Sequence, residues 1–161
     1  MSKKDKIPST PALQALKGAG VAFVPRAYDY VAHGGTGEAA RQLGLDEHHV
    51  VKTMIMQDEN GEPLVVLMHG DKEVSTKNLA RQLGRKTVEP CAERDAQRYT
   101  GYQVGGISPF GTRRAMPVFV EKGILELERL YINGGKRGLL VEISPQALVK
   151  LLNPAPVGAA L

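Results

Sequence analysis

The stretch Val50-Val51-Lys52-Thr53-Met54-Ile55-Met56 decides the fold, together with the chain that follows it. Its β-branched and long apolar residues predict a buried strand. Asn60-Gly61 comes shortly after it, and this dipeptide is a strong signal for a tight turn between two strands. A second apolar run, at residues 64–68, predicts the returning strand. We therefore expect these two strands to form an antiparallel pair.

Outward from this hairpin, the chain alternates short helical patterns with short apolar runs. Cap residues, prolines and glycines mark where the helices begin and end. The expected helices are residues 10–18, 38–43, 75–83, 92–99 and 144–152, and the further expected strands are 21–28, 86–89, 118–120, 130–132 and 139–143.

This pattern predicts an α/β (α+β) fold rather than a doubly wound sheet with regular βαβ units. We expect one domain over residues 1–161, with a core at about 11–152. Residues 1–8 and 153–161 are expected to be tails.

The composition is that of an ordinary globular chain, with 42% hydrophobic and 24% charged residues. No apolar run is long enough for a membrane helix, and no signal peptide is evident, so a cytoplasmic protein is expected. One cysteine excludes an internal disulfide framework. The net charge of +4 is compatible with a nucleic-acid partner without requiring one. Only 5% of the residues are aromatic, which argues against an extended platform for stacking many bases.

Lys52 is unusual because it lies inside an apolar strand. Alternation places it on one face with Val50, Met54 and Met56. Burying a lysine is costly unless it has a partner or a chemical role. Two structural alternatives remain open, namely an edge-strand lysine and a lysine whose stem lies along the sheet while its ammonium reaches water.

Residues 100–111, with the sequence TGYQVGGISPFG, form a second candidate. The four glycines allow unusual backbone conformations and close approach of a ligand. Backbone N–H groups in such a loop can bind an anion or a developing oxyanion. The spacing matches neither a Walker loop nor a dinucleotide fingerprint. A purely structural loop is the alternative.

Residues 133–138, NGGKRG, form the third candidate. The glycines suit a tight turn, and Lys136 and Arg137 could contact phosphates. Simple solvation of the two basic side chains is the alternative.

Two weaker candidates concern nucleophilic or metal chemistry. Cys91 lies at an expected helix start, where a thiolate is favoured. Neighbouring His48 and His49 diverge on a helix, and no Cys, His or Asp cluster completes a metal site in the sequence. We therefore expect no metal and no cofactor, and the sequence offers no catalytic triad.

Taken together, the strand 51–54, the loop 100–109 and the turn 134–138 resemble the YbaK members of the YbaK/prolyl-tRNA synthetase editing superfamily. The likeness runs from about residue 11 to residue 152, and the Gly-Gly-Ile-Ser-Pro run is its most specific part. It implies a mixed, largely antiparallel sheet curled into an incomplete barrel with helices outside. It also implies removal of cysteine from mischarged Cys-tRNA(Pro), with prolyl-tRNA synthetase as a possible partner.

The resemblance also implies roles for individual residues. Lys52 matches the family's key lysine, and its ammonium would hold the ester carbonyl or the phosphate of the terminal adenosine. The substrate's own thiol is the expected nucleophile, so the protein would supply positioning and electrostatic stabilisation. Gly105, Gly106 and Ile107 would support the carbonyl oxygen. The remaining expected contacts to the substrate or the 3′ end of the tRNA are Tyr28, Thr53, Ser108, Pro109, Asn133, Gly134, Gly135, Lys136 and Arg137.

The chain departs from the family pattern at two positions. Many relatives carry serine where this chain has Asn133, and some carry a carboxylate where it has Leu140. The alternatives are therefore a deacylase for alanine or another small amino acid, a non-catalytic protein that binds tRNA or a synthetase, and a hydrolase or binding protein for another small ester or nucleotide.

Overall fold

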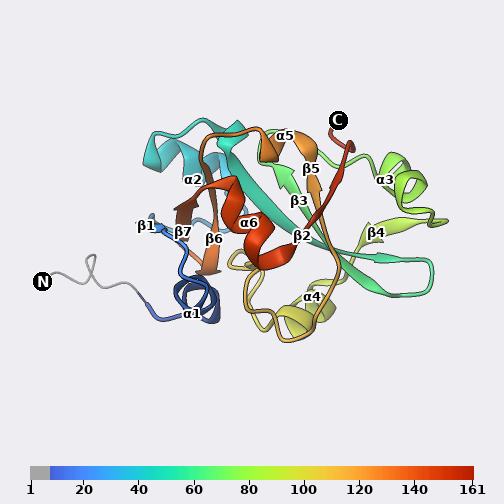
Figure 1. The fold of residues 1–161 in the computed structure, drawn as a ribbon, viewed down its shortest axis with the longest axis horizontal. Coiled ribbons are helices and arrows are strands. Elements are labelled where there is room, and N and C mark those ends of the chain that lie inside the picture. Colours follow the sequence, from blue (N-terminus) through green and yellow to red (C-terminus); the bar gives the residue numbers. More distant parts are fainter. Residues whose placement is uncertain (1–7) are drawn as a thin grey trace, which may run out of the picture.

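The computed structural model describes residues 8–161, which build one mixed, open β-sheet with helices on both faces (Figure 1). The strand order is β1-β7-β6-β2-β3-β5-β8, and β4 pairs with β2 beside this path. The strands are β1 (Val24–Ala27), β2 (Val50–Asp58), β3 (Pro63–His69), β4 (Val88–Pro90), β5 (Val118–Glu121), β6 (Leu130–Lys136), β7 (Leu139–Ile143) and β8 (Ala155–Val157).

Within the described residues, β1–β7, β6–β7, β2–β3 and β2–β4 pair antiparallel, whereas β2–β6, β3–β5 and β5–β8 pair in parallel. The expected α/β class with a mixed sheet is confirmed, and so is the hairpin at Asn60-Gly61. Asp58 supports that turn, because its Oδ1 accepts hydrogen bonds from the amides of Asn60 at 2.8 Å and Glu62 at 3.1 Å.

The helices begin at residues that cap their first turn. Thr10 Oγ1 accepts a hydrogen bond from the Leu13 amide at 3.1 Å, and Ser75 Oγ accepts one from the Asn78 amide at 3.2 Å. One helix begins earlier than expected, at Gly35 rather than Glu38. The helices are α1 (Pro11–Gly18), α2 (Gly35–Leu43), α3 (Thr76–Leu83), α4 (Glu93–Thr100), α5 (Lys122–Leu125) and α6 (Pro145–Leu152), with a 3₁₀ turn η2 (Glu47–His49). None of the helices in residues 8–161 is long and apolar enough to cross a membrane.

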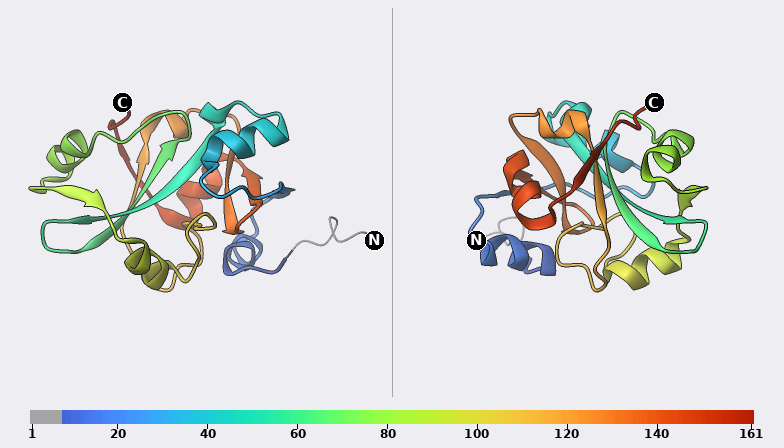
Figure 2. Two further views of the ribbon diagram at one scale, coloured as in Figure 1. Left: turned by 180° about the vertical axis from the view of Figure 1, so that it is seen from behind. Right: turned by 45° about the vertical axis from the view of Figure 1, so that its right-hand side comes forward.

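The two faces of the sheet are covered by different helices (Figure 2). Helices α1 and α6 pack on the face that carries Val51 and Ile55, where the main core lies. Helices α2 and α3 pack on the opposite face, α2 against Val50 and α3 against Met56. Lys52 therefore lies on the face of α2 and α3, between two separate apolar clusters, as the alternation predicts.

The sheet divides along one edge of β2. Strand β6 pairs with this edge only at Val50 and Val51, and β4 joins it only from Met56 onward. Residues 52–55 pair with β3 on the other edge, and none of the strands in residues 8–161 pairs with them on this one. This gap exposes the middle of a central strand to the loops around it.

The C-terminal residues differ from the expected tail. Strand β8 pairs in parallel with β5, and the Ala159 amide donates a hydrogen bond to Glu121 Oε1 at 2.6 Å. Val157 and Ala159 are buried. The segment is short and rich in proline, glycine and alanine, so no periodicity in the sequence distinguishes it from a tail. The expected N-terminal tail falls on residues that lie, except for Pro8, outside the described part of the chain.

Candidate active site

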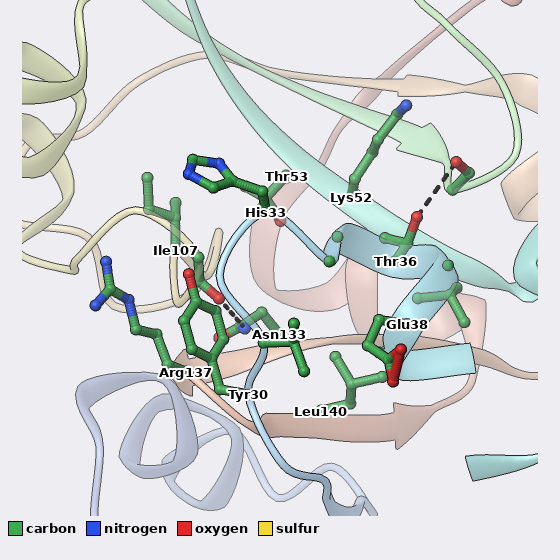
Figure 3. Close-up of a pocket in the computed structure, with 18 of the residues that line it drawn as sticks. Tyr30, His33, Thr36, Glu38, Lys52, Thr53, Ile107, Asn133, Arg137 and Leu140 are labelled. Carbon is green, nitrogen blue, oxygen red and sulfur yellow. Dashed lines mark hydrogen bonds between the residues drawn. The ribbon is translucent and has the colours of Figure 1, made fainter. Parts of the chain in front are cut away.

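A pocket of about 840 Å³ lies at the gap in the sheet (Figure 3). Its walls come from β2, from the loop before α2, from the glycine-rich loop after α4, and from the β6–β7 hairpin. The pocket therefore unites the three candidate motifs, which are far apart in the sequence.

Lys52 reaches this pocket from β2. The strand is central in the sheet, but Lys52 lies where one edge of β2 has no strand partner within residues 8–161. Its side chain is 23% exposed, and its Nζ lies 3.7 Å from Oε1 of the largely exposed Glu73. An ion pair of this length with an exposed carboxylate contributes little to stability. The ammonium thus keeps donors that a ligand in the pocket could use.

Thr53 contributes an unsatisfied polar atom. It lies on the face of β2 opposite Lys52, and both residues line the pocket because the sheet is open beside them. Its Oγ1 is buried and has no hydrogen-bond partner among the described residues. Leaving a buried hydroxyl unpaired costs free energy, so such atoms are often found where a ligand or an ordered water binds.

Hydrogen bonds made by the buried side chains of Tyr102 and Ser108 hold the glycine-rich loop in place. The Tyr102 hydroxyl is buried and donates to the Phe110 carbonyl at 2.6 Å, and burial raises the pKa of Tyr102 to about 12. Ser108 is fully buried, and its Oγ accepts a hydrogen bond from the Phe110 amide at 3.2 Å. Ser108 and Pro109 do not line the pocket. Ser108 therefore braces the loop instead of facing a ligand there.

Gly106 also differs from its expected role. Its amide already donates to the Gln103 carbonyl at 2.8 Å. A Cβ at this position would lie 2.7 Å from the amide nitrogen of Arg137, so the glycine is required by close packing against the turn. By contrast, Gly105 and Ile107 line the pocket. Their amides have no hydrogen-bond partner among the described residues, and they remain available to bind an oxyanion.

Asn133 joins the glycine-rich loop to the basic turn. Its Nδ2 donates to the Gly105 carbonyl at 3.2 Å, while its Oδ1 accepts from the amides of Gly135 at 2.7 Å and Lys136 at 3.1 Å. Gly135 needs a positive φ of 95° for this turn. A serine could not span all three partners at once, because it is shorter and carries only one polar atom.

Arg137 is fixed at one end of the pocket. Its Nε donates to the Val104 carbonyl at 2.9 Å, and its guanidinium lies over the ring of Tyr30 at 5.0 Å from the centroid. Figure 3 shows Arg137 and Tyr30 together on one side of the pocket and Lys52 on the other. The pocket therefore presents cations at two separated points.

Several lining residues were not anticipated from the sequence. Tyr30 and His33 lie in the loop before α2, and Glu38 lies within α2. The only available signal was the position of Tyr30 two residues after Tyr28. His33 has a positive φ of 63°, an uncommon conformation for a residue other than glycine. Hydrogen bonds from Arg41 and Gln42 hold the pKa of Glu38 below its usual value, which makes this carboxylate a poor base.

Of the expected site residues, Tyr28, Lys52, Thr53, Gly105, Ile107, Asn133 and Arg137 line the pocket. Gly106, Gly135, Lys136 and again Arg137 line a second hollow on the other side of the loop. Gly134 is buried, and its carbonyl accepts a hydrogen bond from Thr10 Oγ1 at 2.6 Å. Burial raises the pKa of the half-buried Tyr28 hydroxyl, so this group is neutral near pH 7.

Neither of the two weaker candidates, Cys91 and the neighbouring pair His48 and His49, lines the pocket. Burial, and then the charges of Asp95 and Glu89, raise the pKa of Cys91, which does not line the pocket. His48 bonds to Asp71 through Nδ1 at 2.9 Å and stacks on His69 with ring centroids 3.8 Å apart. The Nδ1 of His69 bonds to the His48 carbonyl at 2.7 Å, and its Nε2 faces Gly123. His48, His69 and Asp71 each offer an atom that could ligate a metal ion, and these atoms lie within 4.8 Å of one another. None of the three residues lines the pocket.

The pocket is thus built to hold a developing negative charge near fixed donors. No cysteine or serine occurs among the described residues that line it, and within those residues no hydrogen bond joins His33 to a hydroxyl group. Such a site can position a substrate and stabilise an oxyanion. It also holds one hydroxyl–carboxylate pair, in which Thr36 Oγ1 donates to Glu47 Oε2 at 2.8 Å.

Residues 34–151 match the aminoacyl-tRNA editing domain, and the chain belongs to this family. The chain is 31% identical over 114 residues to EbsC of Enterococcus faecalis, which carries the name of a Cys-tRNA(Pro)/Cys-tRNA(Cys) deacylase. The aligned region covers 71% of this chain and 70% of EbsC. A proline–tRNA ligase of Limosilactobacillus reuteri is 28% identical over 105 residues, which are 63% of this chain and 18% of the ligase.

Solved structures agree on the fold. A crystal structure described as a trans-editing enzyme for prolyl tRNA synthetase superposes with a TM-score of 0.81 at 20% identity, covering 96% of this chain and 99% of that one. The crystal structure of a hypothetical protein reaches a TM-score of 0.85 at 25% identity over 94% of this chain and all of its own. The resemblance to the YbaK editing proteins is therefore confirmed at the level of family and fold.

Proposed function

We propose that this protein is a free-standing, single-domain aminoacyl-tRNA deacylase that removes cysteine from Cys-tRNA(Pro) in the cytoplasm. The observation that carries the proposal is that Lys52 lines the same pocket as Gly105 and Ile107, whose amides have no hydrogen-bond partner among the described residues. The match to EbsC supports cysteine as the amino acid and tRNA(Pro) or tRNA(Cys) as the carrier. Membership of the editing family supports ester cleavage on aminoacyl-tRNA.

The proposed chemistry uses the substrate's own nucleophile. The thiol of the esterified cysteine attacks the ester carbonyl, so a carbon–sulfur bond forms and the carbon–oxygen bond to the ribose breaks. The thiol proton passes to the departing ribose oxygen, which leaves a cyclic thiolactone and free tRNA. Lys52 and the amides of Gly105 and Ile107 stabilise the negative charge on the carbonyl oxygen, and the pocket holds thiol and carbonyl close together. The lack of a serine or cysteine among the described lining residues fits this route.

A deacylase for alanine or another small amino acid is the second candidate. The observation that favours it is Leu140, which lines the pocket where some relatives carry a carboxylate. An apolar wall accepts a methyl group as readily as a thiol, because the two differ little in size.

The test is deacylation of tRNA(Pro) carrying cysteine, alanine or serine, with and without prolyl-tRNA synthetase, against the spontaneous rate of each ester. Serine matches cysteine in shape but has a much weaker nucleophile, so rapid loss of cysteine alone supports thiol attack. Mass spectrometry of the first product separates thiolactone from directly hydrolysed cysteine. Loss of alanine at a similar rate would move the protein to the second candidate. Binding of tRNA with no ester lost would leave a non-catalytic binding protein.

A further inference from the structure

A second hollow of about 450 Å³ adjoins the candidate active site. The glycine-rich loop and the β6–β7 turn separate the two cavities, and Arg137 lines both. The second hollow is lined by residues 8–11, by residues of the glycine-rich loop from Gly101 to Gly106, and by Gly135, Lys136 and Arg137 of the turn. A chain of nucleotides leaving the first pocket past Arg137 would enter this hollow directly.

Within residues 8–161, the charged residues that line the second hollow are all basic. No carboxylate lines it among the described residues, whereas Lys136 and Arg137 both do. Arg113 adds a third cation, because its side chain packs against Gly101, with its Nε 3.0 Å from where a Cβ of Gly101 would lie. Lys136 and Arg113 are exposed, and neither forms an ion pair within residues 8–161.

The opposite end of the first pocket, next to Lys52, carries negative charges. Glu47 and Glu73 line it beside Lys52, and Glu73 is largely exposed. A polyanion leaving at that end would meet carboxylates, and like charges repel it. Glu93 of α4 also lines the first pocket, whereas no carboxylate lines the second hollow among the described residues. We therefore expect RNA to leave through the second hollow.

We propose that the 3′ strand of a tRNA enters and leaves the first pocket at the Arg137 end and crosses the second hollow, with its phosphates at Arg137, Lys136 and Arg113. This inference rests on the proposed function for the identity of the RNA. It adds a direction to the bound strand and a binding residue, Arg113, that no motif marks. It also orients the terminal nucleoside, since Lys52 then faces the ester and the phosphates lie at the guanidinium end.

The test measures binding of uncharged tRNA, which requires no turnover, by fluorescence anisotropy over a range of salt concentrations. Each phosphate contact contributes about 0.7 to 0.9 to the slope of log K against log salt concentration. The double variant Lys136→Gln/Arg113→Gln should therefore bind at least tenfold more weakly at low salt and should lose roughly 1.5 from the slope. Thermal unfolding of each variant checks that these exposed substitutions leave the fold intact.

The matched control is Lys77→Gln, which removes the same charge from an exposed position in α3 that lines neither cavity. It should keep the wild-type slope. Lys72→Gln reports on the carboxylate-rich end, next to Glu73. The inference would be overturned if the slope of log K against log salt concentration fell in Lys72→Gln but not in the double variant. It would also be overturned if the slope fell equally in the double variant and in Lys77→Gln.

A second measurement compares kcat/KM for intact Cys-tRNA(Pro) with that for cysteinyl-adenosine, which has no phosphate. The ratio should fall at least tenfold in the double variant. If wild-type protein cleaved neither ester but the salt slopes behaved as expected, the proposed deacylation would fail while the RNA path stood. If both esters were cleaved and the ratio stayed constant in the double variant, the path would be wrong and the deacylation would stand.

Discussion

The side-chain amide of Asn133 donates a hydrogen bond to the Gly105 carbonyl at 3.2 Å, and this contact ties the glycine-rich loop to the basic turn. The same side chain accepts two amide hydrogen bonds from the turn, from Gly135 and Lys136. One residue thus fixes the distance between two elements of the pocket. In this chain we infer that Asn133 positions the amides of Gly105 and Ile107, and it need not touch the substrate to do so.

Asn133→Asp should separate these contacts. The carboxylate keeps both acceptors for the turn but loses the donor and faces the Gly105 carbonyl with like charge. We expect kcat/KM for deacylation to fall by roughly tenfold, equivalent to about 1.4 kcal/mol, with most of the loss in kcat. Asn133→Ser, which restores the residue common in relatives, should lose less because its hydroxyl can still serve part of the turn. Steady-state kinetics on Cys-tRNA(Pro) measure kcat and KM separately. A rise in KM with unchanged kcat would instead indicate that Asn133 binds the substrate directly.

Gly106→Ala should displace the loop without changing any polar group. The new Cβ would lie 2.7 Å from the Arg137 amide and 2.8 Å from the Lys136 carbonyl carbon, both backbone atoms that cannot move aside easily. We expect a lower Tm and loss of most deacylation. Gly18→Ala in α1 is the matched control, because nothing lies within 4 Å of its Cβ position and its backbone is helical. That variant should retain Tm and activity, and similar behaviour of both variants would refute the packing argument.

The sequence predicts those parts of the fold that local rules determine. Alternation places Lys52 correctly, and the cap at Ser75 and the turn at Asn60-Gly61 occur where expected. The gap beside residues 52–55 was not predictable, because it depends on where two distant strands stop pairing with β2. Strand β8 was not predicted for the same reason, because only its pairing with β5 distinguishes it from a tail.

The site shows the same division between local pattern and tertiary contact. The motifs bring Lys52 and Arg137 to one pocket, but they do not distinguish Ser108, which braces the loop, from Ile107, which lines the pocket. Neighbouring residues in an irregular loop follow no periodicity, so their directions depend on tertiary packing. Tyr30 was missed because its importance lies in its contact with Arg137, which the sequence does not reveal.

The carboxylate of Asp58 should make the Tm of the protein depend on pH in the acid range. Burial acts to raise its pKa, but amide hydrogen bonds from Glu62 and Asn60 and the Arg85 guanidinium outweigh burial, so the pKa lies below its ordinary value of 3.8. A carboxylate whose pKa is lowered by folding stabilises the fold above its unfolded pKa, and that contribution is lost as pH falls through the folded pKa. We expect Tm to fall below about pH 4 in wild-type protein, and to fall less steeply there in Asp58→Asn, which starts lower at pH 7. Parallel Tm–pH curves would show that Asp58 does not contribute.

Lys52→Met should abolish deacylation without weakening the fold. Methionine keeps the length and the apolar stem but removes the ammonium, whose pairing with exposed Glu73 is too loose to contribute much stability. Loss of one well-placed oxyanion donor costs about 10²- to 10³-fold in kcat. We expect a loss of that size with both Cys-tRNA(Pro) and cysteinyl-adenosine, because we place the ammonium at the ester carbonyl. Glu73→Gln is the control for the lost ion pair and should change kcat less than about twofold. A Lys52→Met defect seen with the tRNA ester but absent with cysteinyl-adenosine would instead assign the ammonium to a phosphate, and it would reverse the direction inferred for the bound strand.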